Sequence, residues 1–155
     1  MGHYAFINQE NEVVEVIVGK DEDDLETLPE EFSSWEEFYE TQRDGLTCKR
    51  TSYNTTGNTH RLDGTAFRGN YASIDGLYDP ENDVFYTKQP YLNWTISEET
   101  NWIWTPPVEF PSDANLEFDT SLPVKNYIWS EEVNNWVMTH QMEYDSETET
   151  WEIIE

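Results

Sequence analysis

The sequence predicts an α+β fold that is mainly β: an N-terminal hairpin plus one helix, followed by a series of short aromatic-clamped β-hairpins. Three segments share a spacing in which an aromatic residue, followed by Asp or Ser, has a second aromatic residue seven positions later. A polar turn separates the two aromatics, as in two strands joined by a tight connection. Good helix signals are confined to one segment, residues 34–43. The aromatic pairs are Tyr78 and Phe85, Trp129 and Trp136, and Tyr144 and Trp151.

A fourth hairpin is expected among these units, around Ile96 and Trp104. Its spacing is one residue longer, because the polar connection at residues 98–101 is longer. Prolines bound the strands of this half of the chain, since proline cannot donate a hydrogen bond to a central ladder. We therefore expect residues 70–155 to form a β-hairpin repeat part, distinct from an N-terminal α+β part at residues 1–69.

The N-terminal part begins with apolar runs at residues 3–8 and 13–19, which predict a hairpin. The second run is strongly β-branched and too continuous for a strand with one solvated face, so both of its faces are expected to be covered. Ser34, followed three residues later by Glu37, is a capping-box signature and predicts the start of a helix. A further strand is expected over residues 46–53.

Catalytic and metal-binding signatures are absent from the sequence. Cys48 is the single cysteine, which excludes an internal disulfide, and we expect it to be a small core residue rather than a nucleophile. The acidic runs at residues 21–24 and 79–83 are interpreted as solvated segments rather than calcium ligands. No phosphate-binding loop, serine elbow or zinc-ligand spacing is present. We therefore expect no enzyme activity, no catalytic residue, no metal and no cofactor.

The chain is strongly acidic. Its 33 Asp and Glu residues against 8 Lys and Arg residues give a formal net charge of −25. Such a charge repels nucleic acid and anionic membranes, so neither is an expected partner. Aromatic residues make up 15% of the chain, and each buried ring removes roughly 150 to 250 Å² from water, so a core can form. We expect no export signal, because the N-terminus has no positive region ahead of a 7-residue apolar core, and no membrane span, because no 18-residue apolar run exists.

Basic residues concentrate around an irregular, glycine-containing loop at residues 54–69. Five of the eight Lys and Arg residues fall between positions 43 and 68, beside His60. We interpret this region as a docking surface for an acidic partner or an identical copy, because a guanidinium can hold a carboxylate through two hydrogen bonds. The alternative is that each arginine pairs locally with Asp or Glu. The candidate partner-binding residues here are Arg50, Arg61 and Arg68.

The aromatic residues of the C-terminal half allow two interpretations. Exposed Trp and Tyr beside acidic and Asn side chains are typical of carbohydrate binding, whereas an aromatic pair that clamps a hairpin explains the seven-residue spacing. We favour the clamp. Three tryptophans exceed what one hairpin needs and are therefore candidates for an intermolecular surface: Trp94, Trp102 and Trp104.

Several short sequence motifs also point to the origin of the chain. They are Asn70-Tyr71-Ala72, Tyr78-Asp79, Gln89-Pro90-Tyr91 with Asn93-Trp94, and Trp104 with Pro107, Val108, Phe110 and Pro111. In these phrases the chain resembles a family of small uncharacterised proteins of tailed marine bacteriophages, cyanophages among them. The resemblance includes the opening hairpin and the phrase at 51–54, but not the acidic stretch 21–42 or the last hairpin, 143–154. It implies a phage gene product belonging to the virion and made in the host bacterial cytoplasm.

These observations favour a non-enzymatic virion structural protein, either a capsid decoration or a tail-associated component, that acts by protein–protein binding. Its expected partners are other virion proteins or copies of itself. Two alternatives stay open. One is an inhibitor whose acidic surface mimics nucleic acid and blocks a host protein. The other is a glycan-binding attachment module that uses the aromatic residues.

Overall fold

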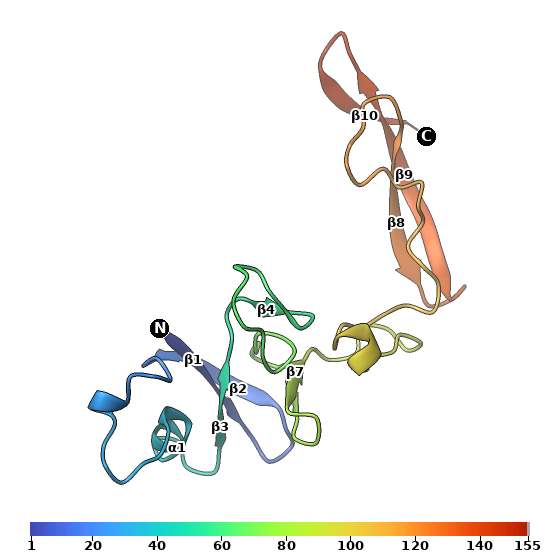
Figure 1. Cartoon of the computed structure of the whole chain (residues 1–155). Coiled ribbons are helices and arrows are strands. Elements are labelled where there is room, and N and C mark those ends of the chain that lie inside the picture. The colour runs from blue at the N-terminus through green and yellow to red at the C-terminus, as the bar shows by residue number, and fades with distance from the viewer. Residues whose placement is uncertain (155) are drawn as a thin grey trace. The chain divides into compact units, whose positions relative to one another are not determined.

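The computed structural model describes residues 1–154, and the chain divides into two compact units (Figure 1). Unit 1 contains Met1–Pro90 and Ile96–Thr105, and unit 2 contains Tyr91–Thr95 and the chain from Pro106 onward. The division differs from the boundary expected between residues 69 and 70. Residues 70–90 belong with the N-terminal sheet; for example, the backbone N–H of Val13 donates to the Gly76 carbonyl at 2.9 Å.

Unit 1 is organised around a three-stranded antiparallel sheet with the order β2-β1-β3. The strands are β1 (Gly2–Ile7), β2 (Val13–Gly19) and β3 (Thr47–Thr51), which confirms the opening hairpin. Side chains alternate along the central strand, so Tyr4 and Phe6 face one side while Ala5 and Ile7 face the other. All four are at most 2% exposed, and β1 is therefore the strand covered on both faces.

The expectation that both faces of residues 13–18 are covered is wrong. In β2, Val14 is 42% exposed and Val18 is 59% exposed. The physical reason is the strand order: β2 lies at the edge of the sheet, and the central position goes to the less β-branched β1.

Different elements cover the two faces of β1. Helix α1 (Trp35–Glu40) supplies Trp35 to the cluster that contains Tyr4, Phe6 and Cys48. The hydroxyl of Ser34 caps this helix by accepting from the Glu37 N–H at 3.2 Å, as the sequence predicts. On the other face, β6 (Leu77–Asp79) and β7 (Val84–Tyr86) form a hairpin whose inward side chains join the second cluster, Ala5, Ile7, Val13, Ala72, Tyr78 and Phe85.

The remaining elements of unit 1 are short. A 3₁₀ turn, η1 (Leu25–Thr27), precedes α1, and the irregular loop carries a small hairpin of β4 (Thr55–Thr56) and β5 (Thr59–His60). The fourth hairpin expected around Ile96 and Trp104 is not formed. A 3₁₀ turn, η2 (Glu98–Thr100), lies there instead, closed by a hydrogen bond from the Ser97 N–H to the Thr100 hydroxyl at 3.0 Å.

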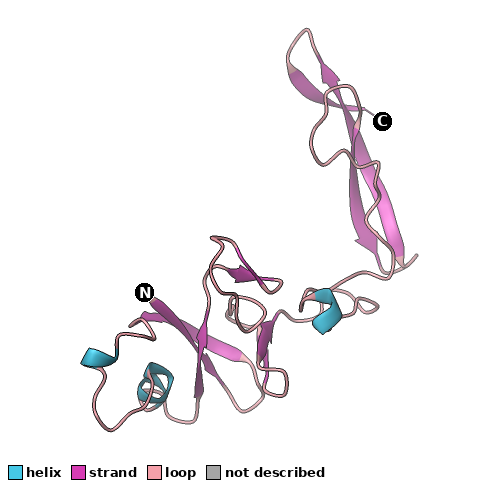
Figure 2. Cartoon of the chain, viewed as in Figure 1, coloured by secondary structure: helices cyan, strands magenta, loops and turns pink. Residues whose placement is uncertain are grey.

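Unit 2 is built on a second antiparallel sheet with the order β10-β9-β8. Its strands are β8 (Val124–Ser130), β9 (Asn135–Asp145) and β10 (Thr150–Ile154). Trp129 pairs directly with Trp136, and Tyr144 with Trp151, so both expected aromatic clamps are present here. With one α-helix and several small antiparallel sheets within residues 1–154, the structure confirms the α+β, mainly β fold (Figure 2).

Burial of Cys48 makes it a core residue, as expected. It is 2% exposed, and this burial, together with nearby Glu36 and Glu40, raises the pKa of the thiol to about 12. Because the thiolate is the reactive form, we expect native protein to react with a disulfide reagent at pH 8 far more slowly than unfolded protein. Counting thiols with and without denaturant checks this. Equal labelling rates in the two states would contradict the burial.

Candidate binding sites

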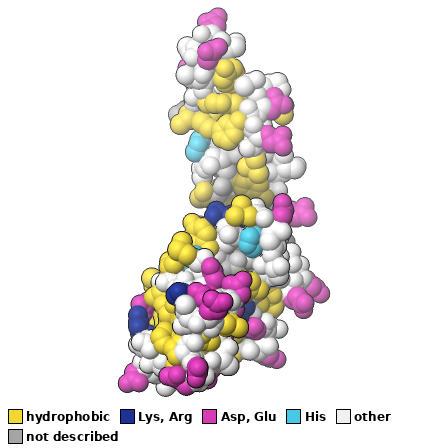
Figure 3. All heavy atoms as spheres, turned by 60° about the vertical axis from the view of Figure 1, so that its left-hand side comes forward, with side chains coloured by type: hydrophobic (Ala, Val, Ile, Leu, Met, Phe, Trp, Pro, Cys, Tyr) yellow, Lys and Arg dark blue, Asp and Glu magenta, His cyan; other side chains and the backbone are white. Residues whose placement is uncertain are grey.

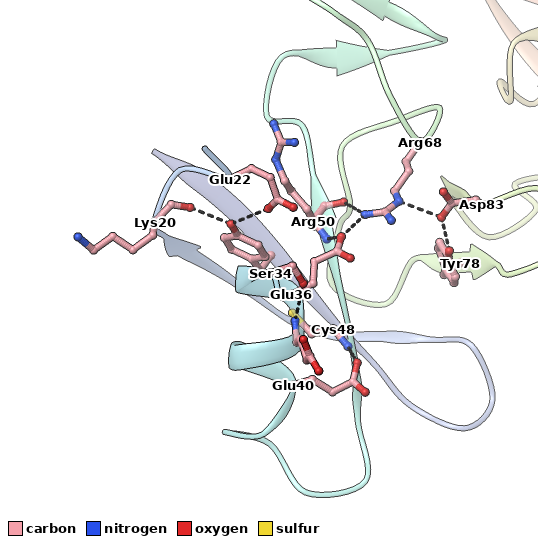
Figure 4. Close-up of polar contacts among 12 residues, drawn as sticks. Lys20, Glu22, Ser34, Glu36, Glu40, Cys48, Arg50, Arg68, Tyr78 and Asp83 are labelled. Carbon is pink, nitrogen blue, oxygen red and sulfur yellow. Dashed lines mark hydrogen bonds and ion pairs between the residues drawn. The ribbon is translucent and has the colours of Figure 1, made fainter. Parts of the chain in front are cut away.

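Arg68 connects α1, β3 and the β6–β7 turn of unit 1 through its side chain (Figure 4). Its side chain is 17% exposed, and its guanidinium forms ion pairs with Glu36 of α1 and, at 2.8 Å, with Asp83 of the β6–β7 turn. It also donates to the carbonyl of Arg50 at 2.8 Å, and Asp83 accepts a further hydrogen bond from the Tyr78 hydroxyl. The Nε and Nη1 groups of Arg68 thus bond within its own chain, which matches the alternative of local pairing.

The ionisation of the Arg68 network follows from these contacts. Burial acts to raise the pKa of Asp83, but the hydrogen bond from Tyr78 and the charge of Arg68 outweigh burial and hold this pKa below its usual value. Burial first, and then the same hydrogen bond, raise the pKa of Tyr78. At neutral pH the network therefore contains a charged carboxylate and a neutral phenol.

Arg50 and Arg61 behave differently from Arg68. Each places its guanidinium over an aromatic ring: Arg50 lies 4.4 Å from the Phe67 centroid and Arg61 lies 4.9 Å from the Tyr53 centroid. Neither forms an ion pair with another described residue, although the Nε of Arg61 donates to the side chain of Asn54 at 2.5 Å. These two of the three expected arginines therefore keep charge available to a partner.

A hollow of about 440 Å³ lies beside Arg50. His3, Tyr53, His60 and Phe67 are among its lining residues. The His3 ring stacks on Tyr53 with centroids 5.3 Å apart, and burial, followed by the nearby N-terminal charge, lowers the pKa of His3. The lowered pKa favours the neutral imidazole of His3 at pH 7, and Arg50 supplies a cationic side chain to this hollow.

The three tryptophans expected on one intermolecular surface belong to different units. Trp94 is part of unit 2, where its ring packs against Trp129 at 5.7 Å and Trp136 at 6.0 Å between centroids. Trp102 and Trp104 belong to unit 1. Trp94 thus contributes to the internal clamp of unit 2, and Trp102 and Trp104 are the pair that can act together.

Trp102 and Trp104 line a hollow of about 480 Å³ in unit 1, called here the tryptophan hollow. The indole N–H of Trp104 donates to the Thr87 carbonyl at 2.7 Å, and its ring lies 6.5 Å from that of Tyr86. The same two tryptophans line a second hollow of about 440 Å³. The other residues of the tryptophan hollow are Asp79, Asn82, Tyr86, Ile96, Ser97 and Glu98.

The sheet of unit 2 has one face without Asp, Glu, Lys or Arg. Side chains alternate along each strand, and the register places Val124 opposite Met142, Ile128 opposite Val137, and Met142 opposite Ile153. Three of these side chains reach solvent: Ile128 is 52% exposed, Val137 40% and Ile153 68%. This uncharged face consists of Val124, Asn126, Ile128, Ser130, Asn135, Val137, His140, Met142, Tyr144, Trp151 and Ile153.

The charges of this sheet lie on its opposite face and in its turns. Glu143 and Glu152 are directly opposed, and Asp145 is opposite Thr150, all on the face that alternation assigns to Lys125. The space-filling view shows hydrophobic side chains reaching the surface of unit 2 and carboxylates at its upper tip (Figure 3). This face was not expected from the sequence. Alternation of apolar and acidic residues over 142–145 and 151–153 is the signal that could have revealed it.

Comparison of the chain with protein-family models, curated proteins and solved structures finds no match. Across the described range 1–154, no group of three or more His, Cys, Asp or Glu side chains is arranged to hold a metal ion. No helix in that range has the length and apolar character needed to cross a bilayer.

Proposed function

We propose that the protein is a non-enzymatic component of a bacteriophage particle that acts by protein–protein contact, either decorating the capsid or forming part of the tail. The observation that carries the contact function is the uncharged face of the unit 2 sheet. The phage assignment rests on the phrases that resemble marine phage proteins, among them Asn70 to Ala72 and Trp104 to Pro111.

The uncharged face has the composition of a surface that is covered. Alternation places the carboxylates of β9 and β10 on the opposite face, which also carries Trp129 and Trp136 and is partly covered there by Trp94 and Phe110. Ile128 and Val137 are opposed on the exposed part of the face, while Phe118 packs on Trp151, with ring centroids 5.7 Å apart, and covers part of the rest. Exposed apolar side chains gathered on one uncharged face are typical of an interaction site.

A second copy of the chain is the partner that fits the uncharged face best. Unit 2 carries 12 Asp and Glu residues and one Lys, so two copies repel one another wherever these carboxylates approach. In a two-fold symmetric contact the same surface patch of both copies is used, so any carboxylates in that patch are brought close to carboxylates of the other copy. A face without charged residues avoids this repulsion, and the carboxylates of β9 and β10 then point away from the contact.

Self-association should respond to salt and to one added charge on this face. Salt shortens the Debye length from about 10 Å at 0.1 M to about 3 Å at 1 M, so we expect dimer formation to strengthen as salt rises. Val137→Asp should abolish it, because the new carboxylate would be buried against its symmetry mate. Val133→Asp is the matched control, since Val133 lies in the β8–β9 turn and is 60% exposed. Sedimentation equilibrium measures the self-association of the wild-type protein at each salt concentration and of the two variants.

Two outcomes would contradict the contact through this face. One is a protein that stays monomeric at every salt concentration, and the other is equal association of the Val137→Asp and Val133→Asp variants. Association that weakens with salt would instead indicate ion pairs, with Arg50 and Arg61 as the groups to replace.

Quantitative mass spectrometry of purified phage particles tests the location. We expect about tens of copies or more per particle, the stoichiometry of a component that binds repeatedly in a symmetric assembly. Absence from particles combined with expression early in infection would overturn the virion assignment and favour the acidic inhibitor.

A further inference from the structure

The tryptophan hollow combines aromatic rings with carboxylate and amide side chains. Trp102, Trp104 and Tyr86 supply the rings, and Asp79, Asn82 and Glu98 supply the polar groups. Four of its eight lining residues are aromatic or aliphatic and four are polar. Ligand sites likewise combine apolar or aromatic walls with polar groups that fix orientation, in a hollow of about 300 to 1,000 Å³. At about 480 Å³ the tryptophan hollow falls within that range. We propose that it binds a neutral oligosaccharide.

The backbone that presents Trp102 is in an unusual conformation. Asn101 and Trp102 have φ values of 54° and 61°, so two consecutive residues adopt the left-handed region, which is rare for a bulky side chain such as Trp. The surrounding structure holds them there, because the Asn70 amide donates to the Trp102 carbonyl and to the Phe85 carbonyl, each at 2.9 Å. Local strain of this kind concentrates at functional sites.

The Trp102 ring also fits closely against Gly69. A side chain at this glycine, which itself has a φ of 72°, would lie 3.3 Å from the ring. The Trp104 ring is fixed separately by its indole hydrogen bond to Thr87. Both rings are therefore ordered before a ligand arrives, which reduces the entropy lost on binding. Ordered aromatic planes suit the apolar faces of a sugar ring.

The polar groups are suited to sugar hydroxyls. The carboxylate of Glu98 has no hydrogen-bond or ion-pair partner among residues 1–154, so it can accept from a ligand. Asp79 accepts hydrogen bonds from the Asn82 side chain at 2.7 Å and from the Glu81 N–H at 2.9 Å. Carboxylates form strong, charge-assisted hydrogen bonds with hydroxyl donors.

The same carboxylates decide the charge of the ligand. No Lys or Arg lines the tryptophan hollow, and the chain as a whole carries a charge of −25. An anionic sugar or a phosphate group would be repelled. Neutral hexose units combine an apolar ring face with many hydroxyl donors. The second hollow that shares Trp102 and Trp104 suits a chain of several units rather than a single sugar.

Titration with defined neutral oligosaccharides tests the proposal. Cellohexaose, maltohexaose and chitohexaose would be added separately to isotopically labelled full-length protein, with hexagalacturonate as the anionic probe. We expect at least one neutral probe to shift the Trp102 and Trp104 indole N–H resonances saturably, and hexagalacturonate to shift neither. Shifts with the anionic probe alone, or with none of the four, would overturn the proposal.

Two adjacent glutamates provide matched variants. Glu98 lines the tryptophan hollow and Glu99 does not, and both lie in η2. Glu98→Gln should weaken binding about tenfold or more, because it removes a hydrogen bond to a charged acceptor, and Glu99→Gln should leave affinity unchanged. Trp102→Ala should eliminate binding. Equal affinities for the Glu98→Gln and Glu99→Gln proteins would overturn the site even if Trp102→Ala fails to fold.

This site belongs to unit 1, whereas the proposed self-association uses unit 2. Failure of sugar binding and failure of self-association are therefore observed separately, in different assays and with different variants.

Discussion

Trp129→Ala is expected to destabilise unit 2 by about 3 to 5 kcal/mol, the usual range for removing a large aromatic side chain from a core. Trp129 is 6% exposed, and its ring lies 5.4 Å from that of Trp136 and 5.7 Å from that of Trp94, both nearly perpendicular to it. Among the described residues of unit 2, the other buried side chains are Ala114 and Val124. Loss of this ring therefore removes a large fraction of the core of the unit.

Denaturant unfolding measures the effect, followed by a probe in unit 2 because two units need not unfold together. Resonances of residues 124–145 serve this purpose. Val133→Ala is the control and should change stability by less than about 0.5 kcal/mol, since Val133 is largely exposed. If Trp129→Ala falls within the same small range, the clamp contributes nothing and unit 2 is stabilised elsewhere.

The seven-residue aromatic spacing was predictive because the geometry of a hairpin is local. A two-strand unit with a short turn places its paired residues directly across from one another, and the register confirms this for Tyr78 with Phe85 and for Trp129 with Trp136. The same spacing logic fails at Ile96, where left-handed backbone at Asn101 and Trp102 directs the chain away from a hairpin. Left-handed backbone is rare for a bulky residue such as Trp, so the sequence alone does not reveal it at Trp102.

Contacts between residues far apart in the sequence could not be predicted from the sequence. Whether residues 13–19 lie at the centre or the edge of the sheet depends on the pairing of β1 with β3, whose paired residues are 40 to 48 positions apart. The role of Arg68 depends likewise on Glu36, which is 32 positions away, and on Asp83, which is 15 away. The clustering of basic residues between positions 43 and 68 predicted a positively charged region. It did not predict which of the arginines form ion pairs within the chain.

Arg68→Ala is expected to cost about 2 to 3 kcal/mol, because it leaves the carboxylates of Glu36 and Asp83 without their cation. The magnitude is below that of a fully buried pair, since the Glu36 side chain is 22% exposed and that of Asp83 is 54% exposed. Arg61→Ala is the matched control: its guanidinium lies over Tyr53 without an ion pair, and its loss should cost less than about 0.5 kcal/mol.

Acid should reduce the difference between wild-type protein and the Arg68→Ala variant. The pKa of Asp83 is depressed in the folded state, so its contribution is present above the unfolded value of about 4 and is lost as the pH falls through the lower folded value. Chemical unfolding at a series of pH values measures this. A stability difference that stays constant into strong acid would show that Arg68 acts through packing of its side chain and not through its charge.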